Sequence, residues 1–394
     1  MKYPLYIYRL ALIAFYFVQG VIFSAWASRL PDVKEIFSFN DSELGLLLLA
    51  IPLVQITTLP LWGTIVEKLG SDRCLRMSVV FYAGSLAVCG GLTLTQNVWL
   101  LVAGLILLGL GETAHNISLN TQGVMLEKLY GKSIMSLFHG AWSFSGFIAG
   151  IVSSFLVNHG VEVWEHFLGV LFVCLAILLA LRKYLIPDHT EIEGLSEEPS
   201  RENETHALLS PFILLVGVIA CVCMACEGVV YDWSSIYFVD VVQSDESLYR
   251  LGYTASMGAM AFGRFVGDIF IRKWGRIFML RVCAVLICSG LSLLVAFPQV
   301  VPATLGFLLV GLGVSAIAPI CFALAGTAPS VSPSKGLAMV IAISNLGFLL
   351  APPIIGFLSH SLGSLRWALL VMTLVALSIL VLPQWLGKFS MKNV

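Results

Sequence analysis

The feature that most constrains this chain is the grouping of its apolar residues into blocks of about twenty, separated by short polar segments. A helix of about twenty apolar residues crosses the roughly 30 Å hydrocarbon core of a bilayer and satisfies its own backbone hydrogen bonds there. Twelve such blocks occur, near residues 5–28, 43–66, 74–95, 98–122, 133–157, 164–184, 209–233, 247–271, 277–297, 302–326, 336–358 and 364–385. The sequence therefore predicts an all-α integral membrane protein with twelve transmembrane helices.

Composition and motifs argue against other classes of protein. Only 11% of the residues are charged, whereas a soluble globular domain carries about 25%. The nine cysteines fall mostly within the apolar blocks, where we expect them to pack as small residues rather than hold a metal. The sequence contains no phosphate-binding loop and no nucleophile elbow. We therefore expect no enzymatic activity, no metal, no organic cofactor and no nucleic-acid partner.

Positive charges in the polar segments predict how the chain is oriented. If both termini are cytoplasmic, seventeen of the 22 lysines and arginines lie on the cytoplasmic side. Four lie outside, namely Arg29, Lys34, Arg250 and Arg366, and Arg264 lies within a span. This distribution predicts a multi-pass protein of the cell (inner) membrane with both termini in the cytoplasm.

The longest polar stretch, residues 186–207, is acidic and divides the apolar blocks six and six. Its composition favours a flexible cytoplasmic linker over a folded domain. We therefore expect an N-terminal six-helix bundle over 1–184, a linker over 185–208 and a C-terminal six-helix bundle over 209–394.

The two halves also resemble one another as an internal repeat. Corresponding positions, all at nearly one offset, are Trp26 and Trp233, Asp32 and Asp240, and the segments GTIVEKLG (63–70) and DIFIRKWGR (268–276). Repeated halves are typical of secondary transporters, in which the substrate site lies near the bilayer midplane where the repeats meet.

The segment from Gly63 to Gly70 has a readable pattern of glycines and charges. Gly63 would let two helices approach closely. Glu67, which directly precedes Lys68, would accept hydrogen bonds from amides or pair with a cation. Gly70 would turn the chain. The pattern resembles the Gly-x3-Asp-Arg-x-Gly-Arg loop motif of the major facilitator superfamily. With twelve spans divided six and six, the chain is identified as a member of this superfamily, and the resemblance implies that the motif acts in gating.

The second copy of this motif departs further from the superfamily pattern. Asp268 takes the position of the glycine and Arg272 that of the acid. Because the two residues are four apart, they are expected to form an ion pair along one helix. We therefore interpret this second copy of the gating motif as a structural latch only, formed by the ion pair.

A narrower resemblance involves the fourth apolar block. The run Gly111-Glu112-Thr113-Ala114-His115-Asn116 resembles a segment of fucose permease and related sugar–proton symporters, and Trp26-Ala27 with Leu30-Pro31-Asp32 is similar to the end of their first span. The resemblance implies that Glu112 and Asp32 take part in proton coupling and sugar binding. His115 and Pro31 depart from the pattern. Short segments such as Phe138-His139-Gly140 also resemble uncharacterised bacterial inner-membrane facilitators.

Glu112 is the leading candidate on physical grounds as well. An ionised carboxylate at bilayer depth costs about 2.5–3.5 kcal/mol or more unless it faces protein or water. On a helix, Glu112, Asn116 and Asn120 share one face, with His115 beside them. This face is expected to line a cavity, with Glu112 as a protonatable coupling residue. The alternative is a buried acid satisfied by a hydrogen bond between helices.

Other polar residues at membrane depth are weaker candidates. Glu227 is a second proton-coupling candidate. The candidates for substrate binding are His115, Asn116, Asn120, His139, Trp142, Asp232 and Asn345, with Gln19 and Gln55 as further neutral polar groups. Each has a structural alternative, such as a hydrogen bond across helices for His139 or a solvated helix end for Asp232. Trp26 and Trp233 are expected to anchor span ends at the membrane interface.

The leading hypothesis is a secondary transporter that imports a small polar solute, a sugar or sugar derivative, with a proton as the coupling ion and by alternating access. The alternative is a proton-antiport exporter of drugs or metabolites. A third possibility, a membrane receptor or scaffold, is disfavoured because no sizeable soluble domain is present. We expect the chain to function as a monomer, with a small-molecule substrate and the lipid bilayer as its partners.

Overall fold

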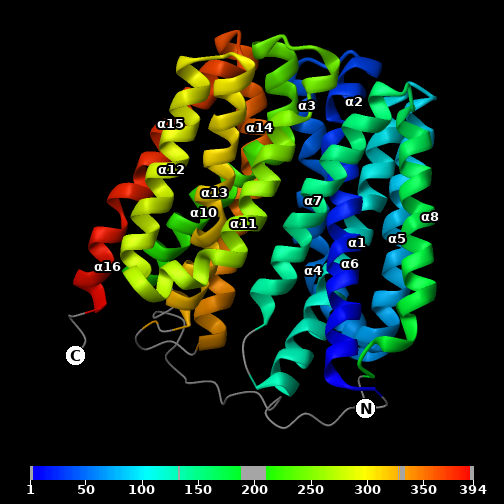
Figure 1. Ribbon diagram of the computed structural model, residues 1–394, viewed down its shortest axis with the longest axis vertical. Coiled ribbons are helices and arrows are strands. Elements are labelled where there is room, and N and C mark those ends of the chain that lie inside the picture. Colours follow the sequence, from blue (N-terminus) through cyan, green and yellow to red (C-terminus); the bar gives the residue numbers. More distant parts are fainter. Residues whose placement is uncertain (1–2, 132–133, 188–209, 327, 329–332, 391–394) are drawn as a thin grey trace. The chain divides into compact units, whose positions relative to one another are not determined.

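The computed structural model describes residues 3–131, 134–187, 210–326, 328 and 333–390, and these residues form helices joined by short turns, with no strand among them (Figure 1). By its internal contacts the chain divides into two compact units. Unit 1 comprises Met1–Leu195 with Ser244–Thr254, and unit 2 comprises Ser196–Gln243 with Ala255–Val394. A short segment from the second half of the sequence therefore packs with the first half. The expected linker over 185–208 lies almost entirely outside the described residues.

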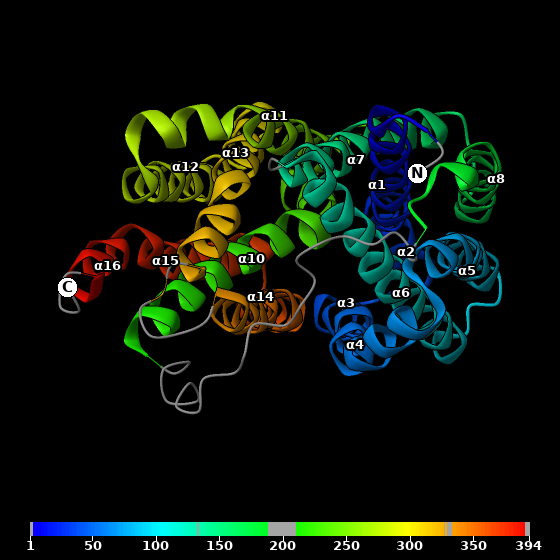
Figure 2. The ribbon, with the colours of Figure 1, turned by 90° about the horizontal axis from the view of Figure 1, so that it is seen from below.

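In its described residues, unit 1 contains six long helices, and α1 and α6 each pack against several of the others. Its elements are α1 (Leu5–Ser28), α2 (Leu30–Ile36), α3 (Asp41–Leu48), α4 (Ala50–Leu69), α5 (Ser71–Thr93), α6 (Val98–Tyr130), α7 (Met135–Asn158), α8 (Val163–Leu181) and the short turns η1 (Arg182–Tyr184) and η3 (Glu246–Leu248). Helix α5 packs against α6 and α8, α4 packs against α6, and α1 packs against α7 (Figure 2).

Unit 2 is centred on α10. Its elements are α10 (Pro211–Tyr237), the π-helical turn η2 (Phe238–Val242), α11 (Leu251–Trp274, whose first four residues belong to unit 1), α12 (Arg276–Ala296), α13 (Val300–Ala325), α14 (Pro333–Leu362), α15 (Leu365–Val381) and α16 (Pro383–Ser390). Helix α10 contacts α13, α14 and α15, while α12 packs against α13 and α15 (Figure 2).

The helices have the lengths and surfaces of membrane spans. Within the described residues, eleven helical segments are long and apolar enough to cross a membrane. Helix α11, 24 residues long, is the twelfth and is less apolar because it carries four charged residues, namely Arg264, Asp268, Arg272 and Lys273. Large apolar side chains face outward, and Phe172, Leu179 and Phe357 are 63%, 64% and 64% exposed. Such surfaces are stable in lipid and confirm the membrane class.

The ends of the helices follow local sequence. Asn40 and Glu43 form a capping box at the start of α3. Gly70 after α4 and Gly275 before α12 have φ angles of 92° and 80°, a region that favours glycine. These two glycines occupy corresponding positions of the sequence repeat, so the repeat extends to backbone conformation. Helix α6 runs beyond the expected end of the fourth span, because it ends only at Gly131 with φ of 65°.

Two side chains near the C-terminal end of α6, the end predicted to face the cytosol, bind neighbouring segments. The Gln122 amide donates to the Ile186 carbonyl at 2.8 Å and accepts from the Ile186 amide at 2.9 Å, and it also donates to Ser71. Glu127 accepts from the backbone amides of Ile134 and Met135 at 2.8 and 3.0 Å, and so caps the start of α7. These contacts fix the segments that follow α8 and precede α7.

Candidate functional site

The predicted polar stripe of α6 is present on one side of that helix. Asn116 is exposed, and Glu112 and Asn120 are half-buried. Asn120 is held in place, because the Tyr16 hydroxyl of α1 donates to its Oδ1 at 2.8 Å and its own Nδ2 donates to the Asn116 carbonyl at 2.9 Å. The stripe is therefore an ordered polar surface with one exposed amide.

Glu112 interacts with side chains from two neighbouring helices. Its partners are Gln55 of α4 and Tyr82 of α5. The preceding residue, Gly111, allows α5 to come this close, because a Cβ there would lie 2.8 Å from the Tyr82 Cα. In the described part of the chain, no lysine, arginine or histidine pairs with Glu112. The carboxyl group is thus held by neutral polar groups at the middle of the helix.

His115 does not belong to this surface. Its side chain is completely buried, and Nδ1 lies 3.2 Å from the Ser78 hydroxyl of α5. His115 still lies near Glu112, because its ring centre is 6.0 Å from that of Tyr82, the tyrosine that contacts Glu112. The expectation that His115 lines a cavity is corrected. His115 precedes the exposed Asn116 by one residue, and this step turns its side chain by about 100°, toward α5.

His139 and Trp142 of α7 lie near the aromatic residues of α1. His139 is exposed and meets the Tyr16 ring edge-on at 5.7 Å between ring centres. Trp142 is half-buried, with its ring centre 5.5 Å from that of Phe23. Tyr16 thus contacts both Asn120 of α6 and His139 of α7, so the structure brings together the candidate residues of these two helices.

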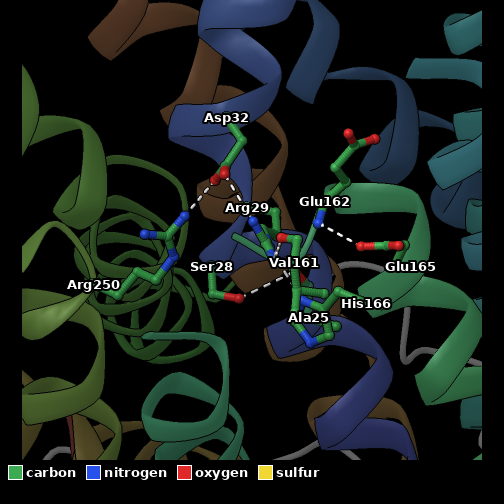
Figure 3. A network of polar contacts seen from close by, with 9 residues as sticks. All are labelled: Ala25, Ser28, Arg29, Asp32, Val161, Glu162, Glu165, His166 and Arg250. Carbon is green, nitrogen blue, oxygen red and sulfur yellow. Dashed lines mark hydrogen bonds and ion pairs between the residues drawn. The ribbon is translucent and has the colours of Figure 1, made fainter. Parts of the chain in front are cut away.

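Asp32 has a different environment from Glu112. Its carboxylate is bound by Arg29, with Nη1 at 2.9 Å from Oδ1, and by Arg250 through Oδ2 (Figure 3). Arg29 also donates to the Val161 carbonyl at 2.7 Å and to His166 Nδ1 at 3.2 Å. These contacts connect the start of α2, the start of α8 and the segment Ser244–Thr254. We call this network, made of Arg29, Asp32, His166 and Arg250, the arginine clasp.

The two arginines of the clasp, which the sequence places on the outer side of the membrane, are buried. Their side chains are 2% and 1% exposed. Burial lowers the pKa of the Arg250 guanidinium, and the nearby Asp32 carboxylate opposes that change. Because both oxygens of Asp32 are bound to arginines, its geometry suits a structural connection, and nothing in it supports the expected role in proton coupling.

Unit 2 contains a separate charged pair at membrane depth. Glu227 of α10 is buried, and its Oε1 lies 3.1 Å from Nη2 of Arg264 on α11. The Tyr231 hydroxyl donates to the same oxygen. The Tyr231 ring is stacked on Phe348 of α14 with 6.1 Å between ring centres. Glu227 is therefore held by a cation and a phenol, unlike Glu112.

The remaining candidates of unit 2 are less tightly placed. Asp232 of α10 and Asn345 of α14 are both half-buried. For neither does the described structure contain a side-chain hydrogen bond. They belong to helices that pack against each other, and their roles in substrate binding stay predictions.

The gating-motif residues lie at helix ends, with one difference from expectation. Within unit 1, Gly63 does not mediate a close approach of helices, because a Cβ added there would meet no described atom within 4 Å. Glu67 and Lys68 are exposed at the end of α4. Gly70 makes the expected turn. Asp268 and Arg272 lie one turn apart on α11, and both are exposed.

The expectation that Trp26 and Trp233 anchor span ends at the membrane interface is corrected, because they are 3% and 0% exposed. Other residues of these sites were missed by the sequence reasoning. The contact between Tyr231 and Glu227 could have been predicted, because residues four apart on one helix are neighbours. Arg264 was noted in the sequence as a charge within a span. Nothing in the sequence pointed to Tyr16 and Tyr82, because their roles depend on neighbouring helices.

Two helical units with polar and ionisable side chains at membrane depth define a polytopic membrane transporter. The sequence pattern of the Major Facilitator Superfamily matches residues 10–332, and the chain belongs to this superfamily. The chain is therefore a transporter rather than an enzyme.

Curated relatives agree with this assignment. Membrane protein MosC of Rhizobium meliloti is 28% identical over 348 residues, which cover 88% of this chain and 83% of that protein. An uncharacterised transporter of Sinorhizobium fredii is 29% identical over 370 residues, covering 93% and 95% of the two chains. An uncharacterised transporter of this superfamily from Yersinia pestis is 27% identical over 364 residues, or 92% of each chain.

Solved structures share the fold. The nucleoside transporter NupG matches with a TM-score of 0.74 at 12% identity, covering 97% of this chain and 99% of that one. A bacterial homologue of the human lysosomal transporter Spinster matches with a TM-score of 0.75 at 13% identity, over 100% and 99%. FucP in its outward conformation matches with a TM-score of 0.62 at 15% identity, over 96% and 98%. At these identities the matches show the fold alone.

Proposed function

We propose that the protein imports a small polar solute, a sugar or sugar derivative, together with a proton, by alternating access. In this proposal it resides in the inner membrane with both termini in the cytoplasm, and Glu112 is the coupling acid. The observation that carries the proposal is the environment of Glu112. A carboxyl group held by neutral polar side chains, with no paired cation among the described residues, can gain or lose a proton without leaving a buried partner charge behind.

The surroundings of the α6 stripe support a polar substrate. Asn116 offers an exposed amide group that binds hydroxyls, with Asn120 one turn away, and Trp142 offers an apolar ring face. His139 is exposed on the neighbouring helix α7. The sequence resemblance at 111–116 favours a sugar.

Uptake by energised cells tests this proposal. Cells expressing the wild-type protein should accumulate a labelled sugar or sugar derivative above the level of cells without it, and a protonophore should abolish the accumulation. Glutamine at position 112 keeps the size and the hydrogen-bonding capacity of the side chain but cannot bind and release a proton. The Glu112→Gln variant should therefore fail to accumulate the solute, yet still exchange labelled for unlabelled solute across the membrane.

Two results would contradict the proposal in different ways. Proton-driven accumulation by Glu112→Gln equal to that of the wild type would exclude Glu112 as the coupling acid. Drug resistance on expression, without uptake of any sugar, would instead support the proton-antiport exporter. Glu35→Gln provides a matched control, since it makes the same change at an exposed glutamate of α2.

A further inference from the structure

The arginine clasp contains one side chain that can gain a charge near neutral pH, the imidazole of His166. This residue lies in the first turn of α8 and is 5% exposed. Its Nδ1 accepts a hydrogen bond from Nε of Arg29 at 3.2 Å (Figure 3). A ring nitrogen that accepts such a bond carries no proton. The clasp therefore holds His166 in its neutral form.

A proton on this nitrogen would make the contact between His166 and Arg29 repulsive. Both ring nitrogens of an imidazolium are donors, so the N–H of Arg29 would face another N–H. Arg250 also acts on His166 through its charge. Protonated His166 would thus be a third cation beside the carboxylate of Asp32, whose two oxygens are already bound to the two arginines.

The surrounding charged groups do not compensate for such a proton. None of them forms a hydrogen bond or an ion pair with the clasp in the described structure. Glu246 attracts Arg250, but its side chain is exposed, and solvent screens its charge. The groups concerned are Lys34, Glu35, Asp41, Glu43, His159, Glu162, Glu165, Asp245 and Glu246 in unit 1, and Asp240 and Arg366 in unit 2.

Arg250 is the member of the clasp that is held least. Arg29 donates to three acceptors, on Asp32, His166 and Val161. Arg250 donates to Asp32 alone, and its Nε and Nη1 have no acceptor among the described residues. Repulsion from a protonated His166 would therefore release Arg250 before it released Arg29.

Water reaches the edge of the clasp. A cavity of about 480 Å³ lies beside it, lined among others by Arg29, Asp32, Val163, Trp164 and Glu246. This cavity provides a route by which a proton from the side predicted to face outward approaches the first turn of α8.

We infer that the arginine clasp is a proton-sensitive switch, in which a proton that binds His166 releases Arg250 and, with it, the segment Ser244–Thr254. Because the released form binds this proton and the closed form does not, acidic pH favours release. The segment includes the start of α11, whose remaining residues belong to unit 2, so the switch controls whether this start stays with unit 1. The inference goes beyond the proposed function, because it applies whatever solute the protein carries.

Amide hydrogen exchange of the detergent-purified full chain tests this inference. Exchange in residues 244–254 would be measured at about pH 7.5 and about pH 5.5 and corrected for the pH dependence of exchange in an unfolded chain. A histidine in water is half protonated near pH 6.5, so the opening of the segment should increase about tenfold between these two pH values.

Three variants assign the effect to His166. His166→Gln keeps an acceptor for Arg29 but cannot bind a proton, so opening should be the same at both pH values. His166→Asn carries the same amide on a shorter side chain and should also be independent of pH, which provides a second test if His166→Gln does not fold. His159→Gln makes the matched change at an exposed histidine after α7 and should behave as wild type.

The coupling acid Glu112 provides the comparison with the proposed function. Glu112→Gln should keep the pH dependence of the segment, even where it loses proton-driven accumulation. Equal opening of the wild type at both pH values, or an undiminished pH dependence in both His166 variants, would overturn the inference. Loss of the pH dependence in Glu112→Gln or in His159→Gln would assign it to another group and would also overturn the inference.

Discussion

At the residue scale, the position of Glu112 depends on the absence of a side chain at Gly111. A Cβ at Gly111 would lie 2.8 Å from the Tyr82 Cα, so Gly111→Ala must push α5 away from α6 and with it the Tyr82 partner of Glu112. Overpacking of this kind costs about 1–3 kcal/mol. We expect a lower unfolding temperature and a weaker pH dependence of transport, measured by thermal unfolding and by uptake.

Gly84→Ala on α5 is the control for this change. A Cβ there would meet no described atom within 4 Å, and alanine is favoured over glycine in a helix by about 1 kcal/mol. The unfolding temperature of Gly84→Ala should therefore stay the same or rise. Equal unfolding temperatures for the two alanine variants would show that the close approach at Gly111 does not limit stability.

At the element scale, the arginine clasp holds the segment Ser244–Thr254 to the helices of unit 1. Besides Arg250, this segment contributes the Tyr253 hydroxyl, which donates to Ser24 of α1 at 2.7 Å. Asp32→Asn would remove the carboxylate that binds both buried guanidinium groups. Breaking a buried ion pair from one side costs about 3–5 kcal/mol, so we expect a large loss of thermal stability and faster amide exchange in residues 244–254.

An ion pair within one helix serves as the comparison for the clasp. Arg76 and Asp72 of α5 lie 2.5 Å apart, and the Arg76 side chain is 36% exposed. Because exposed pairs contribute about 0–1 kcal/mol, Arg76→Gln should change stability little. An effect of Asp32→Asn no larger than that of Arg76→Gln would mean that the clasp does not hold the segment.

At the scale of the whole molecule, the distribution of lysine and arginine predicts the orientation in the membrane. Burial of Arg29 and Arg250 removes two of the four outside charges from solvent but leaves the asymmetry of seventeen to four intact. A green fluorescent protein fused to the C-terminus should fluoresce, and alkaline phosphatase fused there should be inactive. Active phosphatase would place that end outside and reverse the orientation.

The sequence by itself determined the membrane class, the span positions and the turn at Gly70. These features are local, because the bilayer selects each apolar segment separately and a positive φ angle favours glycine wherever it occurs. The polar stripe of Glu112, Asn116 and Asn120 was predictable for the same reason, since residues four apart share a helix face.

Only the tertiary structure decided which faces meet. It buried His115 against α5, enclosed Trp26 and Trp233, placed Asp32 between Arg29 and Arg250, and paired Glu227 with Arg264. Each of these outcomes depends on which helices pack side by side. Such packing brings together residues as far apart in the chain as Asp32 and Arg250. Hydrophobicity makes a segment enter the membrane, but within lipid it does not choose the partner of a helix. That choice comes from close packing and from the pairing of buried polar groups.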